Sequence, residues 1–234
     1  MTSVRDIARA FAWLAPAGGA KNALLRRLGH DVHPTARVRS SVVWHVDRLV
    51  VGPGATIGRL NLLRNLTAVT VGEAASIGKF NVITAHPAFR RNPGSGTFVV
   101  GHHATVTSRH SFDCSAAVTV GPYSLVAGRG TTVMTHSIDL KLDAQRARPI
   151  EVGERSFVGT RSVLVGGAIL PPRSVLGAGA VLLPGRGDDA PGLFGGVPAR
   201  RLSDISGAWF DRPQTHTRRV VLHLDDGQEQ VADF

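Results

Sequence analysis

The chain has 234 residues, of which 43% are hydrophobic, and a formal net charge of +10 at pH 7. Its single cysteine, Cys114, excludes an intramolecular disulfide framework and a thiolate zinc site, and favours a reducing, cytoplasmic setting. Aromatic residues make up only 6% of the chain, so we expect no stacking platform for bases and no nucleic-acid partner. Near the N-terminus no apolar run approaches the roughly 20 residues of a membrane span, so we expect neither a signal peptide nor an anchor there.

Residues 1–30 are expected to form a helical N-terminal cap. Val4, Ile7 and Phe11 follow one another at helical spacing, and residues 20–28 form a second helical segment before Gly29 closes it. A cap of this kind covers the open end of a sheet. Its basic residues also favour peripheral association with an anionic membrane surface.

A six-residue repeat follows the cap. Counting in sixes from Val152, every step carries an aliphatic residue, and the fourth residue after each of the first five is small. The aliphatic positions are Val152, Val158, Leu164, Leu170, Leu176 and Leu182, and the small ones are Ser156, Ser162, Ala168, Ser174 and Ala180. Neither the helical period of 3.6 nor the strand period of 2 produces sixes. A parallel β-helix does, because each six is one short strand and a turn, with the aliphatic side chain pointing inward.

The repeat predicts an all-β architecture with three parts. Residues 31–185 form the β-helix domain, with an inserted loop at 138–149 and a further loop near 86–96. Residues 186–234 form a C-terminal extension, in which the apolar run 219–224 and the turn at 225–227 can form a hairpin.

Sixes of this kind resemble the hexapeptide-repeat family of left-handed parallel β-helices. Four motifs resemble its maltose and galactoside O-acetyltransferase branch, which includes polysaccharide O-acetyltransferases. They are Thr135-His136-Ser137, the restart of the coils at Pro149-Ile150-Glu151-Val152-Gly153, Val175-Leu176-Gly177-Ala178-Gly179-Ala180, and Gly195-Gly196-Val197-Pro198-Ala199-Arg200. The resemblance implies an enzyme that moves an acyl group, most simply acetyl, from coenzyme A to a hydroxyl of a sugar or glycan precursor in polysaccharide biosynthesis, without a metal.

His136 stands at the position of the family's catalytic histidine, where imidazole accepts the proton of the attacking hydroxyl. The alternative is a histidine that merely occupies a polar turn. The resemblance also implies that Asp113 and His110 bind the acceptor. Asp113 lies 23 residues before His136, so it can approach the same corner of the coil. Its alternative role is to accept backbone N–H bonds at that corner.

The resemblance implies a donor site further along the coils. The expected contacts with the pantetheine arm are Gly159, Thr160 and Ala178. Arg200 falls in the motif near the nucleotide, and the planar donors of arginine suit phosphate. The chain departs from the family at 183–184, where sugar acetyltransferases carry Thr-Lys near the phosphates, and Arg186 is the expected substitute.

The family assembles as homotrimers with donor grooves between neighbours, and we expect a trimer here.

Two other functions fit the same fold. One is a zinc enzyme of the β-helical carbonic anhydrase type, which would need three of His102, His103, His110 and His136 to converge. The other is a non-catalytic solenoid scaffold. Cys114 as a nucleophile is a further mechanism, but its spacing provides no evident base partner.

Overall fold

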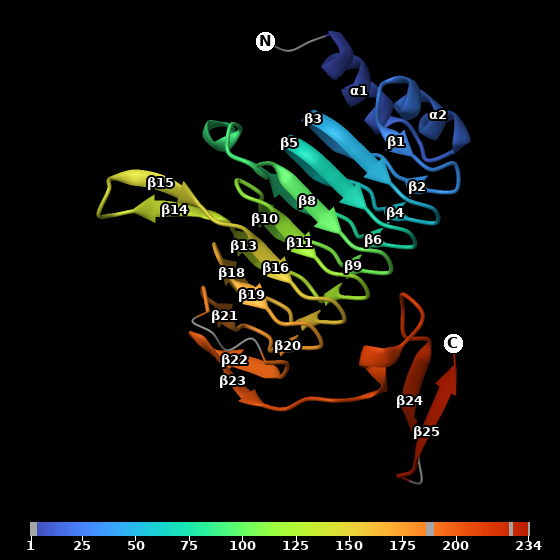
Figure 1. The fold of residues 1–234 in the computed structure, drawn as a ribbon. Coiled ribbons are helices and arrows are strands. Elements are labelled where there is room, and N and C mark those ends of the chain that lie inside the picture. Colours follow the sequence, from blue (N-terminus) through green and yellow to red (C-terminus); the bar gives the residue numbers. More distant parts are fainter. Residues whose placement is uncertain (1–3, 186–189, 225–226, 234) are drawn as a thin grey trace.

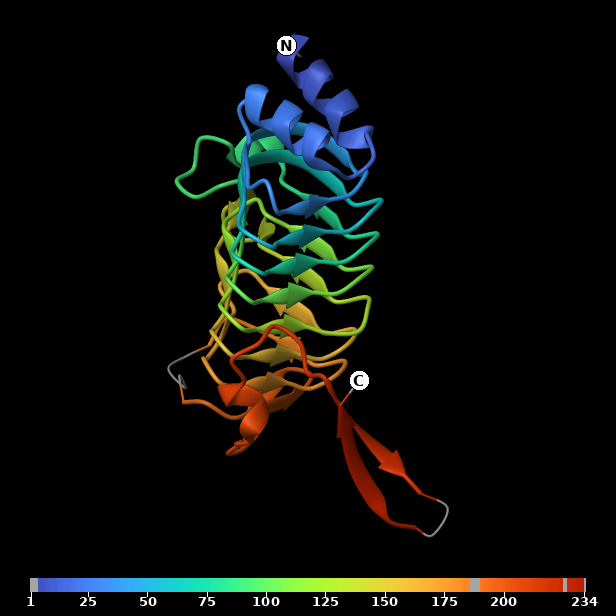
Figure 2. The same cartoon turned by 90° about the vertical axis from the view of Figure 1, so that its right-hand side faces the viewer.

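The computed structural model describes residues 4–185, 190–224 and 227–233. The chain winds into a three-sided prism of parallel strands (Figure 1), as a left-handed parallel β-helix. Each coil contributes one strand to each of three faces. Figure 2 shows the coils stacked directly on one another.

The first and third faces belong to one 12-stranded sheet, because two long strands run across both. The strands of the first face are β1 (Asp31–Val32), the second halves of β3 (Val42–Val51) and β5 (Leu62–Val71), β8 (Thr97–Val100), β11 (Val118–Val120), β16 (Ile150–Val152) and β19 (Ile169–Leu170). The third face contains the first halves of β3 and β5, then β7 (Val82–Thr84), β10 (Ser111–Asp113), β13 (Thr132–Met134), β18 (Val163–Val165) and β21 (Val181–Leu182).

The second face is a nine-stranded sheet. It contains β2 (Arg37–Val38), β4 (Thr56–Ile57), β6 (Ser76–Ile77), β9 (Thr105–Val106), β12 (Leu125–Val126), β17 (Phe157–Val158), β20 (Val175–Leu176), β22 (Leu193–Gly196) and the antiparallel β23 (Ala199–Ser203). Because β22 continues the parallel ladder, the sheet extends beyond residue 185, where the sequence predicts that the β-helix domain ends. Each face is followed by an edge formed by the turns after its strands, and we number the edges in the same way.

The core is built from one inward aliphatic or aromatic side chain per strand. Every aliphatic position counted in sixes from Val152 to Leu182 is at most 6% exposed, as the repeat predicts. The small residues lie at the corners, where neighbouring coils approach closely. A Cβ atom on Gly159 would lie 2.6 Å from the backbone nitrogen of Ala178, which is closer than a carbon atom can approach. Glycine is therefore required there by contact between coils.

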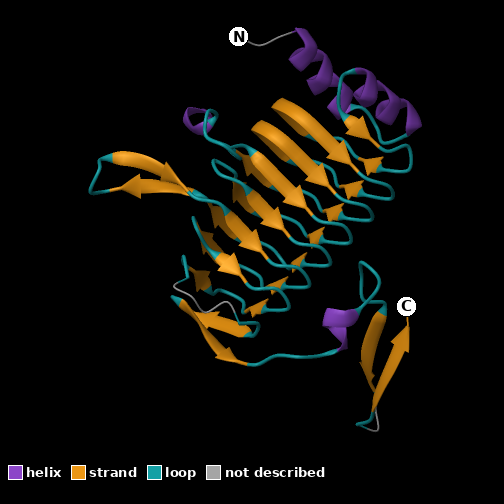
Figure 3. Cartoon of the chain, in the orientation of Figure 1, coloured by secondary structure: helices purple, strands orange, loops and turns teal. Residues whose placement is uncertain are grey.

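Two helices cover the N-terminal end of the prism (Figure 3): α1 (Val4–Leu14) and α2 (Gly19–Arg27). Arg9 ties α1 to the coils, because its Nη1 donates to the carbonyl oxygen of Val46 at 3.2 Å. Lys21 of α2 donates through Nζ to the carbonyl oxygens of Trp13, near the end of α1, and of Ala15, just after it, and burial lowers the pKa of Lys21 to about 8. None of the described helices is long and apolar enough to cross a bilayer.

Both insertions into the coils leave the prism at the third edge. The first is the loop 86–96, which contains the short 3-10 helix η1 (Pro87–Phe89). The second, predicted as a loop, is an antiparallel hairpin of β14 (His136–Asp139) and β15 (Ala144–Ala147) that projects outward (Figure 1). The two insertions therefore flank the same part of the third edge.

The C-terminal segment returns along the first edge. Phe210 lies in the 3-10 helix η2 (Ala208–Asp211), and its carbonyl oxygen accepts a hydrogen bond from the side chain of Arg155 at 2.6 Å. Further along the chain, the hydroxyl oxygen of Thr215 is 2.8 Å from Nδ1 of His103. The chain then forms the hairpin of β24 (Arg219–His223) and β25 (Glu229–Asp233), which extends away from the prism in Figure 2. Within the described part of the chain, the side-chain hydrogen bonds between residues 208–215 and the coils are made at the first edge.

Candidate active site

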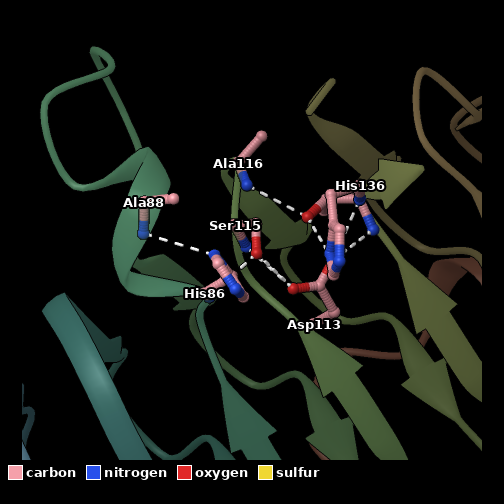
Figure 4. A network of polar contacts seen from close by, with 7 residues as sticks. His86, Ala88, Asp113, Ser115, Ala116 and His136 are labelled. Carbon is pink, nitrogen blue, oxygen red and sulfur yellow. Dashed lines mark hydrogen bonds and ion pairs between the residues drawn. The ribbon is translucent and has the colours of Figure 1, made fainter. Parts of the chain in front are cut away.

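The third edge brings His136 and Asp113 together. Strands β10 and β13 are neighbours in the third face, so Asp113 at the end of β10 lies one coil above the turn that carries His136. Nδ1 of His136 is 2.8 Å from Oδ2 of Asp113 (Figure 4). The side chains are 35% and 19% exposed, respectively, so the pair is partly shielded but open to solvent on one side.

Asp113 is held in place by donors from two coils. Its Oδ2 accepts the backbone N–H groups of Thr135 and His136, both at 2.9 Å, and the hydroxyl of Thr135 at 2.7 Å. Its Oδ1 accepts both the backbone N–H and the hydroxyl of Ser115. Burial alone would raise the pKa of this carboxyl group, but the hydrogen bonds from Ser115, His136 and Thr135 lower it. Asp113 is thus ionised at neutral pH.

This arrangement sets the tautomer of His136. A carboxylate only accepts hydrogen bonds, so Nδ1 of the neutral ring carries the proton and Nε2 carries the free lone pair. Nε2 has no hydrogen-bond partner among the described residues. The ring can therefore accept a proton from a group placed on its open side.

A second histidine lies beside the pair. The rings of His86 and His136 have centroids 5.9 Å apart, and the ring of Phe89 lies 5.8 Å from that of His136. The backbone N–H of His86 donates to the hydroxyl oxygen of Ser115 at 2.9 Å (Figure 4). Ser115 in turn donates to Asp113, so this bond links the loop 86–96 to the carboxylate. Sequence reasoning missed His86, Phe89 and Ser115, and it named Thr135 only as part of the motif around His136. The only signal was the first insertion, which interrupts the repeat at the same edge as the second.

Asp113 therefore accepts backbone N–H bonds at the corner of the coil, which is the alternative to an acceptor contact that the sequence left open. It also orients His136. Both oxygens of this carboxylate already accept hydrogen bonds from groups within the chain, so neither needs the predicted contact with an acceptor as its partner. We therefore treat Asp113 as a positioning residue.

His110 lies inside the prism and does not fit its predicted role at the acceptor. Its side chain is 2% exposed. Nδ1 accepts the backbone N–H of Thr131 at 3.1 Å, and Nε2 is 2.9 Å from the hydroxyl oxygen of Thr107. Burial lowers its pKa to about 4, so the ring is neutral. Its backbone N–H donates to Asn81, which shows that His110 continues a buried polar column at the second edge.

The expected donor contacts also lie at the second edge. Gly159 and Ala178 stack in adjacent coils there, and the backbone N–H of Gly179 donates to the carbonyl oxygen of Thr160 at 2.9 Å. Ala178 is exposed. Arg200 is exposed on β23 and lines a cavity of about 380 Å³ together with residues 183–185. Arg186 lies outside the described residues.

The described parts of the chain do not contain three His, Cys, Asp or Glu side chains that converge to hold a metal ion. Of the histidines that a zinc site would need, His110 is enclosed by its own partners, and His103 stacks on Tyr123 at the first edge. Cys114 is fully buried, and burial, followed by the nearby charge of Asp113, raises the pKa of its thiol. A neutral buried thiol is a poor nucleophile.

No protein-family model matches the chain, and no curated protein matches it. Among solved structures, a variant of AntD, an N-acyltransferase from Bacillus cereus in complex with dTDP-4-amino-4,6-dideoxyglucose and coenzyme A, superposes with a TM-score of 0.54 at 10% identity, over 84% of this chain and 94% of that chain. The polysialic acid O-acetyltransferase OatWY superposes with a TM-score of 0.50 at 12% identity, over 75% of this chain and 84% of that one. These likenesses confirm the fold class predicted from the repeat.

Proposed function

We propose that the protein is an acyltransferase that moves an acyl group from coenzyme A to a hydroxyl of a sugar or glycan precursor, with His136 as general base. The observation that carries this proposal is the pair of Asp113 and His136. The carboxylate holds the proton on Nδ1 and leaves Nε2 unprotonated on an exposed corner. That both AntD and OatWY are acyltransferases supports the reaction class.

The chemistry follows from the tautomer. Nε2 of His136 takes the proton of the acceptor hydroxyl as its oxygen attacks the carbonyl carbon of the thioester. The tetrahedral intermediate then collapses, the carbon–sulfur bond breaks, and the imidazolium returns the proton to the thiolate of coenzyme A. Asp113 remains ionised and stabilises the imidazolium between these steps.

The second edge is the proposed donor site. Its corners at Gly159 and Ala178 have no bulky side chain, so an extended pantetheine arm can lie against the coil backbone there, beside Thr160. The cavity lined by Arg200 at the C-terminal end of the prism suits the phosphate groups of the nucleotide. AntD, which shares the fold, is described in complex with coenzyme A. Arg186 remains a proposed phosphate contact.

The positions of the two edges favour a homotrimer. The donor edge and the histidine edge lie on opposite sides of the third face, so a donor on one copy can meet His136 of a neighbouring copy only if the copies pack side by side. The third face exposes apolar side chains that such packing would bury: Val42, Val82 and Met134 are 51%, 39% and 41% exposed. Light scattering should give a mass of about three times 24.7 kDa. A monomer would contradict a shared site.

We further propose that the enzyme acts in the cytoplasm, in polysaccharide biosynthesis, with peripheral association with a membrane. Its one cysteine is buried and unpaired, as suits a reducing compartment. The N-terminal cap carries exposed apolar side chains on α1, Val4 and Phe11, and exposed basic side chains on α2, Arg26 and Arg27. Co-sedimentation with vesicles containing anionic lipids would test the membrane association.

The proposed reaction is tested by release of free thiol from acetyl-coenzyme A in the presence of sugars, amino sugars, nucleotide sugars and oligosaccharides. We expect acceptor-dependent release that persists after treatment with a metal chelator and is lost in His136→Ala. Absence of coenzyme A binding would contradict the proposal and favour the scaffold. Activity that depends on added zinc and on His103 would favour the metalloenzyme.

A further inference from the structure

Basic side chains follow the second edge, one on each of six successive coils. They are Arg39, Arg59, Lys79, Arg109, Arg129 and Arg161. The backbone pairing at this edge places them within about one position of one another in successive coils, since the N–H of Arg109 donates to the carbonyl oxygen of Lys79, and the N–H of Arg161 donates to that of Arg129, both at 3.0 Å. Coils in such a stack repeat about every 4.8 Å. We call these six residues the basic column.

The charges of the basic column are not neutralised by the protein. All six side chains are exposed, and none forms an ion pair within the described part of the chain. Elsewhere on the surface, exposed arginines do find carboxylates: Arg173 pairs with Asp211 on the first edge, and Arg146 pairs with Asp139 in the hairpin. Stacking like charges in adjacent coils without counter-charges is unfavourable, so the column is suited to a polyanion.

The N-terminal end of the basic column opens into a cavity of about 730 Å³ beneath the helical cap. Arg37, Arg39 and Arg59 line it, together with Gly18 and Gly19 at the start of α2. The lining contains no acidic residue. The basic surface therefore continues into this cavity, away from the corners proposed for the pantetheine arm.

We propose that the basic column binds an extended acidic glycan, and that this glycan is the acyl acceptor. Binding of the glycan is inferred from the charges of the basic column and their spacing. The assignment of this glycan as the acyl acceptor rests on the proposed function. One basic group per coil matches a polymer with one carboxylate per sugar, because the repeat of the coils is close to the length of one sugar residue in an extended chain.

The position of the basic column agrees with this role. Arg109 and Arg129 come just before strands β10 and β13, and the other ends of these strands lead to Asp113 and His136. In side-by-side copies, a chain bound along the second edge therefore reaches the level of His136. Arg59 and Lys79 lie on coils nearer the N-terminus, while the proposed donor contacts lie on coils nearer the C-terminus. Arg161 directly follows Thr160, a proposed donor contact, so the glycan and the donor would meet at the C-terminal end of the basic column.

A nucleic acid fits the basic column less well. Sequence-tolerant binding of single strands uses aromatic side chains on which the bases stack. The turns of the second edge offer one aromatic side chain, Phe80, which already lies against Arg109 with 5.3 Å between the guanidinium carbon and the ring centroid.

The test measures binding of oligogalacturonic acid and oligosialic acid of increasing length by calorimetry, with neutral malto-oligosaccharides of the same lengths as the comparison. We expect the acidic chains to bind more tightly as they lengthen to about six sugars and more weakly as salt is added, and the neutral chains not to bind. The double variant Arg59→Gln, Lys79→Gln should weaken the acidic chains about tenfold and leave coenzyme A affinity unchanged. Arg48→Gln is the matched control, because Arg48 is exposed on the first face, outside the column.

The outcomes separate the two proposals. If acidic chains bind through Arg59 and Lys79 but accept no acyl group from acetyl-coenzyme A, the binding site stands and the acceptor assignment is wrong. If neutral sugars are acylated and acidic chains do not bind, the proposed function stands and the column is not a glycan site. Loss of coenzyme A binding in the double variant would assign the column to the donor, and tighter binding of a single-stranded RNA oligomer would assign it to nucleic acid. Either result would overturn the inference.

Discussion

The second and third edges of the prism border the same face, but they are built in opposite ways. The second edge has tight turns, stacked glycines and a column of exposed basic side chains without counter-ions. The third edge carries both insertions and a partly buried carboxylate that accepts hydrogen bonds from two coils. One edge is a smooth, charged surface suited to extended ligands, and the other is a rigid polar corner suited to proton transfer.

Two histidines show what this difference does to the same side chain. His110 at the second edge has both ring nitrogens enclosed by Thr107 and Thr131, and its pKa is lowered to about 4. His136 at the third edge has only Nδ1 engaged and keeps Nε2 open. Position within the coil thus separates a structural imidazole from one that can act as a base.

Replacing the base gives the largest effect on rate. His136→Ala should lower kcat by about 10²–10⁴, the usual contribution of a positioned general base, while coenzyme A still binds. His103→Ala, on the first edge, is the control and should keep wild-type turnover. If His136→Ala kept a kcat near that of the wild type, His136 would not be the general base.

Asp113→Asn tests whether the third edge orients the base. The amide has a single acceptor oxygen and cannot match the carboxylate in fixing the proton on Nδ1, so kcat should fall about 10²-fold with little change in KM. Asp113→Glu should recover part of the rate if orientation is the cause. A change in KM with constant kcat would instead return Asp113 to the predicted role of acceptor contact.

His110→Asn tests whether the second-edge histidine is structural, because asparagine occupies the preceding positions of the same buried column. The unfolded chain takes up a proton near pH 6.5 and the folded chain only near pH 4, so stability falls as the pH falls through this window. Between pH 7 and pH 5 the wild type should lose roughly 2 kcal/mol more than the variant, measured by urea unfolding. Activity per folded molecule should not change. Loss of activity with full stability would place His110 in the site after all.

The smallest effect is expected from Ala178→Trp at the donor corner. The bulky ring should obstruct the pantetheine arm and weaken coenzyme A about tenfold, without loss of the fold, because Ala178 is exposed. Gly159→Trp is not a useful companion, since any Cβ at that position meets the backbone of the next coil. Ala178→Ser is the matched control and should bind coenzyme A normally. Unchanged affinity in the tryptophan variant would place the donor elsewhere.

The repeat by itself determined the β-helix, because a period of six directly encodes which side chain of each strand points inward, from Val152 to Leu182. The resemblance to hexapeptide-repeat acyltransferases pointed to His136, and the spacing of 23 residues placed Asp113 within reach of it. Only the tertiary structure decided which groups His136, Asp113 and the neighbouring polar residues contact. Stacked coils bring together residues that are about one coil apart in the sequence, and the two insertions change the number of residues in a coil. The sequence therefore could not show that Asp113 orients His136, that His86 lies beside it, or that His110 points inward. The basic column is distributed in the same way: its members are scattered along the sequence and come to one edge only because the coils stack.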